Sequence, residues 1–258
     1  TDTVLTFDIA QKAAFIYEVL GEEPQKQFAL ALAGKVKTAF RENLLDKESG
    51  VVQGGTQTGQ AMAIFYGLLT DKEKEKAFRK LLKCIEEADG HFDTGVLGGR
   101  VLYRVLAENG EVDLAYNMIT RPDFPSYGNW VKRGSTTLRE SFLPTDDDVD
   151  SLNHHFWGDV SAWFYTYLAG MRINPRGTDI TNVDIKPLFP EKLDSVNAYH
   201  NLPDGKISVA WERETEGIAL KIDAAEKLHG KIALPCGYVF ADGTAEKDLK
   251  SGNYKIIK

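Results

Sequence analysis

Asn153–Leu168 reads NHHFWGDVSAWFYTYL and is the last helical stretch before the periodicity of the chain changes. Apolar side chains recur in it with a period of about 3.6 residues, which is the period of one face of a helix. These positions are Phe156, Val160, Trp163, Phe164, Tyr167 and Leu168. We therefore expect an aromatic helix over 153–168, opened by the pair Asn153-His154.

The chain upstream of this stretch is mostly helical. Pro24–Glu42 predicts a helix because apolar residues repeat along one face. They are Phe28, Leu32, Val36 and Phe40. The pattern predicts about seven helices between Phe7 and Gly170, joined by short loops apart from a long one over 121–150.

Short motifs mark where some of these helices begin and end. Thr70-Asp71-Lys72-Glu73 has the spacing of a capping box, which favours a helix start at Thr70. The charged run 72–80 that follows predicts a solvated helix face. Asn109-Gly110 predicts a turn between two short helices.

After Arg172 the pattern becomes the alternation that is typical of strands. The alternating apolar positions are Ile207, Val209 and Trp211, then Ile218, Leu220 and Ile222. Turn signals at 204–205, 216–217 and 242–243 separate the segments, which predicts a small antiparallel sandwich. We expect a multidomain α and β protein with a helical domain over 1–172, a linker at 174–179 and a β-sandwich domain over 180–258.

The composition is that of a globular protein with a core of its own, because 43% of the 258 residues are hydrophobic and 27% are charged. A net charge of −7 argues against nucleic acid or an anionic membrane as a partner and fits a neutral substrate. The longest apolar run, 61–69, is too short to span a bilayer, and no signal peptide is visible at the N-terminus. Cys84 and Cys236 are expected as free thiols. The compartment stays open, with a secreted or periplasmic location favoured over a cytoplasmic one.

Several common kinds of site lack their signature. Gly54-Gly55 and Gly98-Gly99 do not have the spacing or the preceding strand of a phosphate-binding loop. Adjacent residues on a helix diverge by about 100°, so His154 and His155 are not expected to share a metal, and no cofactor is implied. The acidic segment 146–150 predicts a solvated turn, with a Ca²⁺ site as the alternative. Its carboxylates are Asp146, Asp147, Asp148 and Asp150.

Carboxylates in loops remain as candidates for catalysis. Hydrolysis of a glycoside needs a proton donor for the leaving oxygen and a second carboxylate that attacks carbon or activates water. Glu140 is the best candidate, because the hydroxyls of the preceding segment 135–137 could orient it or a water. Asp93, in the loop 90–95, is a weaker one.

Aromatic residues surround Glu140 in the sequence. Sugars present C–H faces that pack on aromatic rings, and hydroxyls that need polar partners. Trp130 and Trp157 are therefore candidates for contact with a sugar, while Trp163 is expected in the core. His154 could donate a hydrogen bond to a sugar hydroxyl, although a structural role is the alternative.

The order of several motifs resembles one known family. Thr56-Gln57-Thr58-Gly59 and the apolar run 61–69 resemble the TQTG helix of bacterial α-L-rhamnosidases, glycoside hydrolase family 78. Residues 90–98 are similar to their GH-x-x-TGFLG loop, and 114–116 with 122–128 to their DLAY and DYPSWGY segments. Residues 134–140 resemble GATT-x-WE, and 151–158 with 163–170 resemble SFNHYAFG and WLY…AG. The resemblance covers about 50 to 170, and the downstream β-domain fits it.

This resemblance implies an (α/α)6 toroid followed by a C-terminal β-sandwich. It maps the general base of an inverting reaction onto Glu140, and a rhamnose-contacting histidine onto His154. In an inverting hydrolase, water lies between two carboxyls about 6.5–9.5 Å apart and attacks the anomeric carbon while the acid protonates the departing oxygen.

Two departures from the family pattern have consequences. The Asp-rich motif that carries the family's general acid has no match between Thr1 and Gln53, and the predicted helices are too few for six hairpins. The chain is therefore expected to be the C-terminal part of a longer enzyme, carrying the base but not the acid. Arg139 stands where the family has Trp, which favours an ionised Glu140 and changes the sugar pocket.

We therefore interpret the chain as the general-base section of an inverting α-L-rhamnosidase-like hydrolase without a metal or cofactor. Its predicted catalytic residue is Glu140, and its predicted substrate-binding residues are His154, Asn153, Trp157, Trp130, Asp93 and Arg139. The expected partner is a carbohydrate. The alternatives are a hydrolase for another deoxy-sugar or a uronic acid, a non-catalytic carbohydrate-binding relative, and an assembly scaffold. An exposed apolar face over Phe7–Phe40 would let two copies form a homodimer.

Overall fold

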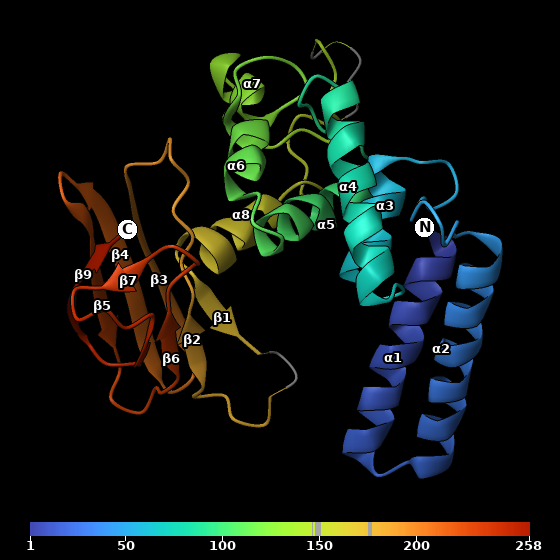
Figure 1. Ribbon diagram of the computed structural model, residues 1–258, viewed down its shortest axis with the longest axis horizontal. Coiled ribbons are helices and arrows are strands. Elements are labelled where there is room, and N and C mark those ends of the chain that lie inside the picture. The colour runs from blue at the N-terminus through green and yellow to red at the C-terminus, as the bar shows by residue number, and fades with distance from the viewer. Residues whose placement is uncertain (146, 148–150, 175–176) are drawn as a thin grey trace. The chain divides into compact units, whose positions relative to one another are not determined.

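The computed structural model describes residues 1–145, 147, 151–174 and 177–258, in which helices precede strands (Figure 1). The helices are α1 (Asp2–Leu20), α2 (Glu23–Asn43), α3 (Gln57–Phe65), α4 (Asp71–Glu87), α5 (Val96–Glu108), α6 (Val112–Thr120), α7 (Tyr127–Lys132), α8 (Asp159–Trp163) and the π-helix η1 (Phe164–Leu168). The strands are β1 (Met171–Ile173), β2 (Val183–Ile185), β3 (Ser195–Leu202), β4 (Gly205–Glu214), β5 (Gly217–Ala224), β6 (Lys231–Ala233), β7 (Val239–Phe240), β8 (Glu246–Asp248) and β9 (Gly252–Ile257). The predicted class, helices followed by a β-sandwich, is therefore confirmed.

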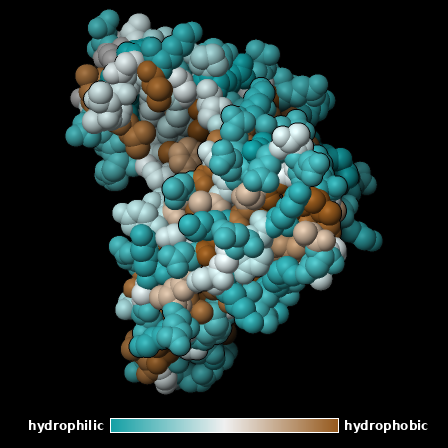
Figure 2. Space-filling model, turned by 90° about the vertical axis from the view of Figure 1, so that its left-hand side faces the viewer, coloured by the Kyte–Doolittle hydropathy of each residue, from teal (hydrophilic) through white to brown (hydrophobic). Residues whose placement is uncertain are grey.

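The chain forms two compact units. The helical unit comprises Thr1–Asn109 and Asn117–Trp157, and the sandwich unit comprises Gly110–Tyr116 and Gly158–Lys258. No helix of the described residues is both long enough and apolar enough to cross a membrane. Figure 2 shows a face on which hydrophilic residues predominate and apolar residues form separate patches.

Helices α1 and α2 form a hairpin and lie side by side along their length (Figure 1). Gly21 ends α1 in the left-handed conformation, with φ of 73°. The buried face of α2 is Ala29, Ala33 and Phe40, whereas Phe28 is exposed. The predicted apolar face of α2 is therefore only partly right. The two alanines allow α1 to approach closely, and Phe28 is left on the flank.

Helix α3 is the buried centre of the helical unit, and α4 and α5 both pack against it. Ala61, Met62 and Ala63 on α3 are at most 1% exposed. The capping box at the start of α4 is confirmed, with the amide of Thr70 donating to Glu73 Oε2 over 2.8 Å. The turn at 109–110 is confirmed as well, since α5 ends at Glu108 and α6 begins at Val112.

Two predictions about the end of the helical region are wrong. Residues 153–158 are not helical, and α8 begins only at Asp159. The predicted loop 121–150 contains α7, a helix of six residues. Ser126 caps α7, because its fully buried Oγ accepts from the amide of Asn129 over 2.9 Å.

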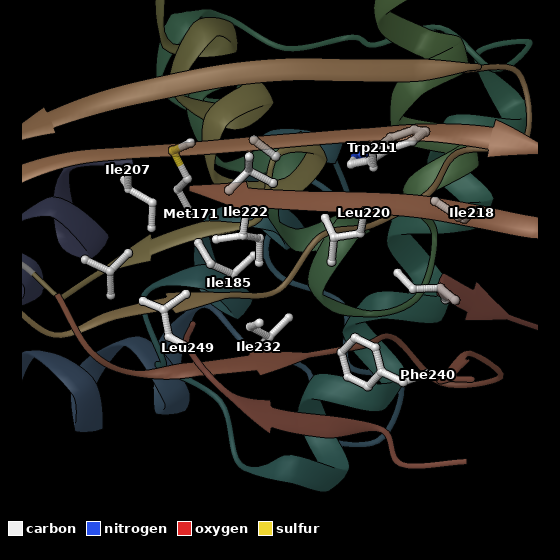
Figure 3. Packing of buried hydrophobic residues seen from close by; sticks show 14 of the residues in the cluster. Met171, Ile185, Ile207, Trp211, Ile218, Leu220, Ile222, Ile232, Phe240 and Leu249 are labelled. Carbon is white, nitrogen blue, oxygen red and sulfur yellow. The ribbon is translucent and has the colours of Figure 1, made fainter. Parts of the chain in front are cut away.

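The sandwich unit contains two sheets, with strand orders β1-β2-β6-β8 and β3-β4-β5-β9-β7. All pairs are antiparallel except β2 with β6, which is parallel. The alternation predicted for β4 and β5 is confirmed, because their apolar positions are at most 2% exposed. Figure 3 shows Leu220 and Ile222 of β5 directed toward Ile185 and Ile232 of the other sheet.

The carboxylate of Glu73 is buried and also accepts a hydrogen bond from Arg41 Nη2 over 2.8 Å. Burial alone would raise the pKa of Glu73, but the hydrogen bonds from Thr70 and the charge of Arg41 outweigh it and lower that pKa. The ionised form is thus favoured in the folded state. Its stabilisation is complete above the ordinary pKa of 4.5 and is lost as the pH falls below it.

We expect Glu73→Gln to lower the free energy of unfolding by about 1–2 kcal/mol at pH 7. The difference from the wild type should shrink below pH 4, as urea unfolding at several pH values would measure. Glu75→Gln, an exposed position on the same helix, serves as the control. A difference that does not change with pH would refute the assigned role of the carboxylate.

The second prediction concerns the exposed flank of the hairpin. Large apolar side chains there are more than half exposed: Ile9, Ile16, Val19, Leu20 and Phe28. We expect the 258-residue chain to self-associate through this flank, because water contact with such a patch is unfavourable. Sedimentation equilibrium should show a dimer that Ile16→Glu with Leu20→Glu converts to monomer, whereas Gln25→Glu does not. A monomer at every concentration, with a constant melting temperature, would rule this out.

Candidate functional site

The predicted catalytic and sugar-binding loops lie side by side in the helical unit. The amide of His154 donates to the carbonyl of Leu138, and the amide of Glu140 donates to the carbonyl of Ser151, each over 2.9 Å. These two bonds place Glu140 and His154 on adjacent loop segments, although 14 positions separate them in the sequence. The structure therefore brings together the two residues on which the functional prediction depends.

Trp157 fixes the backbone of Glu140 from a second side. Its indole Nε1 donates to the carbonyl of Glu140 over 2.9 Å, and its own carbonyl accepts from the hydroxyl of Tyr127 over 3.0 Å. The Trp157 side chain is 8% exposed, so these bonds are shielded from water. Both backbone polar groups of Glu140 are thus occupied, and only its side chain is available for a ligand.

The carboxylate of Glu140 is half-buried and makes no hydrogen bond with any residue that the structure describes. The expectation that the preceding hydroxyls orient it is wrong for Thr137, whose Oγ1 donates to the carbonyl of Leu152 over 2.5 Å. Arg139 Nη1 donates to the same carbonyl over 2.9 Å. Thr137 and Arg139 therefore join the 137–140 loop to residue 152.

An aromatic cluster packs next to the 137–140 loop. Phe142 is its centre, with ring centroids 3.8 Å from Trp130, 4.6 Å from Phe92 and 4.8 Å from Trp157. The rings of Trp130 and Phe142 are parallel within 3°, and Trp130 is only 3% exposed. Trp130 and Trp157 thus pack mainly in the interior, and contact of either with a sugar stays a prediction.

His154 belongs to a local turn rather than to a helix. The amide of Phe156 donates to His154 Nδ1 over 3.2 Å, which makes Nδ1 the acceptor and leaves the proton of the neutral ring on Nε2. The rings of His154 and His155 stack at 5.0 Å and 10°, so the divergence expected for a helix is wrong. Among the described residues no group of three His, Cys, Asp or Glu is arranged to hold a metal.

Asp93 lies in a loop that Gln57 organises. The buried amide of Gln57 donates to the carbonyl of His91 over 3.0 Å and accepts from the amide of Asp93 over 2.9 Å. The carboxylate of Asp93 is exposed, while its neighbour Phe92 packs in the aromatic cluster. In the sequence Gln57 stands out only as part of a family motif, because nothing in the pattern distinguishes a buried side-chain amide from an exposed one.

A charged network borders the same loop. His91 Nε2 lies 3.1 Å from Asp123 Oδ2, and Arg121 contacts both carboxylate oxygens of Asp123 at 2.7 Å. The hydrogen bonds from Arg121 hold the pKa of Asp123 well below its usual range. Arg121 also donates to the carbonyl of Asp89 over 2.7 Å, so this network joins the start of the loop to residues 121–123.

The remaining predicted positions divide between described and undescribed residues. Asn153 is exposed, and its backbone amide donates to Ser151 Oγ over 3.4 Å. Of the acidic segment, Asp147 is exposed in a turn, whereas Asp146, Asp148 and Asp150 lie outside the described residues.

The pair Gly98-Gly99, dismissed above as a phosphate loop, has a packing role. A Cβ on Gly98 would lie 2.5 Å from Thr58 Oγ1, and a Cβ on Gly99 would lie 2.6 Å from Trp157 Cζ3. The two missing side chains therefore allow α5 to approach both α3 and the indole that holds Glu140.

Gly99→Ala should lower the stability of the protein although it improves helix propensity. Alanine in a helix interior gains about 0.5–1 kcal/mol over glycine. Overpacking against Trp157, whose indole donates to Glu140 and whose carbonyl accepts from Tyr127, costs about 1–3 kcal/mol, which is the larger effect. Gly34→Ala on α2 is the matched control, because its Cβ meets nothing within 4 Å and should raise stability. Urea unfolding compares the two, and equal stabilisation by both would contradict the close packing of Trp157.

Comparisons with known proteins agree with this arrangement. Residues 1–168 match the family model of the bacterial alpha-L-rhamnosidase 6 hairpin glycosidase domain, and 174–237 match that of the bacterial alpha-L-rhamnosidase C-terminal domain. An alpha-L-rhamnosidase of Formosa agariphila is 31% identical over 96% of this chain and 28% of its own length. One of Alteromonas sp. is 29% identical over 84% of this chain and 25% of its own length.

Solved structures give the same result. The alpha-L-rhamnosidase of Streptomyces avermitilis, crystallised in complex with L-rhamnose, is 26% identical and has a TM-score of 0.85 over 100% of this chain and 27% of its own. The enzyme of Dictyoglumus thermophilum shares the fold, with a TM-score of 0.85 at 23% identity over 97% of this chain and 30% of its own. The chain thus spans less than a third of the length of these relatives. It belongs to the bacterial α-L-rhamnosidase family, from which it carries residues of the six-hairpin glycosidase domain and of the C-terminal domain.

Proposed function

We propose that this chain supplies the general-base side of the active site of an inverting hydrolase of terminal α-L-rhamnosides. The observation that carries the proposal is the support of Glu140. Its amide and its carbonyl are both bonded within the protein, while its carboxylate has no partner among the described residues. Membership of the family, and the relatives named alpha-L-rhamnosidase, support the choice of reaction.

In the proposed reaction, the carboxylate of Glu140 takes a proton from a water molecule. The water oxygen forms a bond to the anomeric carbon from the face opposite the leaving group, and the bond to the glycosidic oxygen breaks. A carboxylic acid on the other side must protonate that oxygen, and the two carboxyls must be about 6.5–9.5 Å apart to admit the water. We assign no residue of this chain to the acid.

The groups around Glu140 fit substrate binding in this scheme. His154 carries its proton on Nε2 and is half-buried, so it can donate to a sugar hydroxyl next to the base. The exposed side chains of Asn153 and Asp93 add a polar amide and an acceptor. Arg139, which the Leu152 carbonyl holds, completes the proposed set.

Glu140→Gln in the full-length polypeptide tests the proposal. A general base contributes about 10²–10⁴-fold, so kcat on an aryl α-L-rhamnoside should fall by at least that factor with little change in KM. Glu86→Gln, an exposed carboxylate on α4, should leave the rate unchanged. Proton NMR of the first product should show the β-anomer, as inversion requires.

Three results would favour other functions. Binding of L-rhamnose without turnover by the wild type would support a carbohydrate-binding protein instead. Turnover of a different deoxy-sugar or of a uronoside in place of the rhamnoside would change the substrate class. Full activity in Glu140→Gln would remove this residue from catalysis.

A further inference from the structure

Next to His154 the site has a large aromatic ring, that of Phe156, which its own packing leaves accessible. Phe156 is 45% exposed, whereas three rings of the aromatic cluster are enclosed, with Phe92 at 4%, Trp130 at 3% and Trp157 at 8%. Phe156 lies between His154 and Trp157 in the sequence, in the turn that the His154–Leu138 backbone bond holds beside Glu140.

The ring of Phe156 is held in place by the two histidines. Its centroid lies 3.8 Å from that of His154 at 68°, and 5.4 Å from that of His155 at 73°. Its amide donates to His154 Nδ1 over 3.2 Å, so the backbone of Phe156 sets the tautomer of the histidine that its ring contacts. An apolar surface and the Nε2–H donor are therefore fixed relative to each other.

This pairing of groups matches one side of a deoxy-sugar. A 6-deoxyhexose presents a methyl group and ring C–H bonds next to hydroxyls, and such a ligand needs an apolar surface with a hydrogen-bond donor at its edge. A sugar with a hydroxyl on that carbon would place a polar group against the ring, where it would lose hydration without a partner.

We propose that Phe156 is a specificity-determining residue whose exposed ring receives the methyl and C–H surface of the sugar, while His154 Nε2–H donates to a hydroxyl of the same sugar. This inference rests on the proposed function, because it places the sugar beside Glu140. It assigns the preference for a deoxy-sugar to a side chain that does not take part in the proton transfers.

The test compares two substrates that differ by a single hydroxyl. An aryl α-L-mannoside is the aryl α-L-rhamnoside with a hydroxyl on the methyl carbon. A difference of one small group in an apolar pocket changes kcat/KM by about 10–200-fold. For the wild-type full-length polypeptide, kcat/KM for the rhamnoside should therefore exceed that for the mannoside by a factor in this range. Phe156→Ala should lower kcat/KM for the rhamnoside by about 10-fold through KM, and should reduce the preference toward one.

Two further variants distinguish contact between the Phe156 ring and the sugar from a purely structural role of Phe156. Phe156→Trp should keep the preference, because it retains an exposed ring. Phe65→Ala removes a ring on α3 that is 38% exposed, and it should leave kcat/KM for both substrates unchanged. An unchanged preference in Phe156→Ala would overturn the proposal. Equal loss of kcat on both substrates would do so too, because it would show an effect through His154 alone.

Failure of the proposed function can be told apart from failure of this inference. If the wild type hydrolyses neither glycoside, saturation-transfer NMR with L-rhamnose and L-mannose as probes replaces the rates. If L-rhamnose binds more strongly than L-mannose and Phe156→Ala abolishes this difference, the proposed role of the Phe156 ring would hold in a protein without the proposed activity. Equal binding of the two sugars, or none, would overturn it.

Discussion

The hydrogen bond from the indole of Trp157 to the carbonyl of Glu140 is the interaction on which the candidate site depends. It adds an indole to the backbone and side-chain bonds that join the loops over 137–140 and 151–157, and Gly99 leaves room for the indole ring. The hydroxyl of Tyr127 and the ring of Phe142 then fix Trp157 from the other side. A reactive carboxylate needs this kind of support, since a small displacement of its backbone changes the distance to the reacting atom.

Buried and exposed aromatic residues have separate tasks at this site. Trp157 and Trp130 are buried and the half-buried Phe142 packs against both, so these rings hold the loops by packing. Glu140 and His154 are half-buried and Phe156 is exposed, so their side chains reach the surface. Proximity in sequence to Glu140 therefore did not distinguish a buried tryptophan from an aromatic side chain at the surface.

Periodicity predicted the elements whose own residues determine their conformation. The alternation in β4 and β5 and the capping box of α4 depend on neighbouring positions, and both were predicted correctly. The helix over 153–168 failed at its first six residues. There the backbone amide of His154 donates to Leu138 and that of Phe156 donates to His154 Nδ1, so neither makes a helical bond. Family motifs in the sequence singled out Glu140 and His154 as candidate site residues. The role of the buried Gln57 side chain, in contrast, is recognisable only from its hydrogen bonds with the backbone of His91 and Asp93.

The two units differ in how completely they bury their apolar residues. In the sandwich unit the facing side chains of both sheets, such as Ile185, Ile207 and Ile232, are fully buried (Figure 3). The α1–α2 hairpin instead leaves large side chains on its flank in water, and Arg41–Glu73 is among the bonds that join it to the rest of its unit. The contacts that hold Glu140 come from α5, α7 and the loops over 91–93 and 137–157. Among the described residues, the bonds that hold the backbone of Glu140 involve neither α1 nor α2, so the support of the carboxylate is separate from the exposed hairpin.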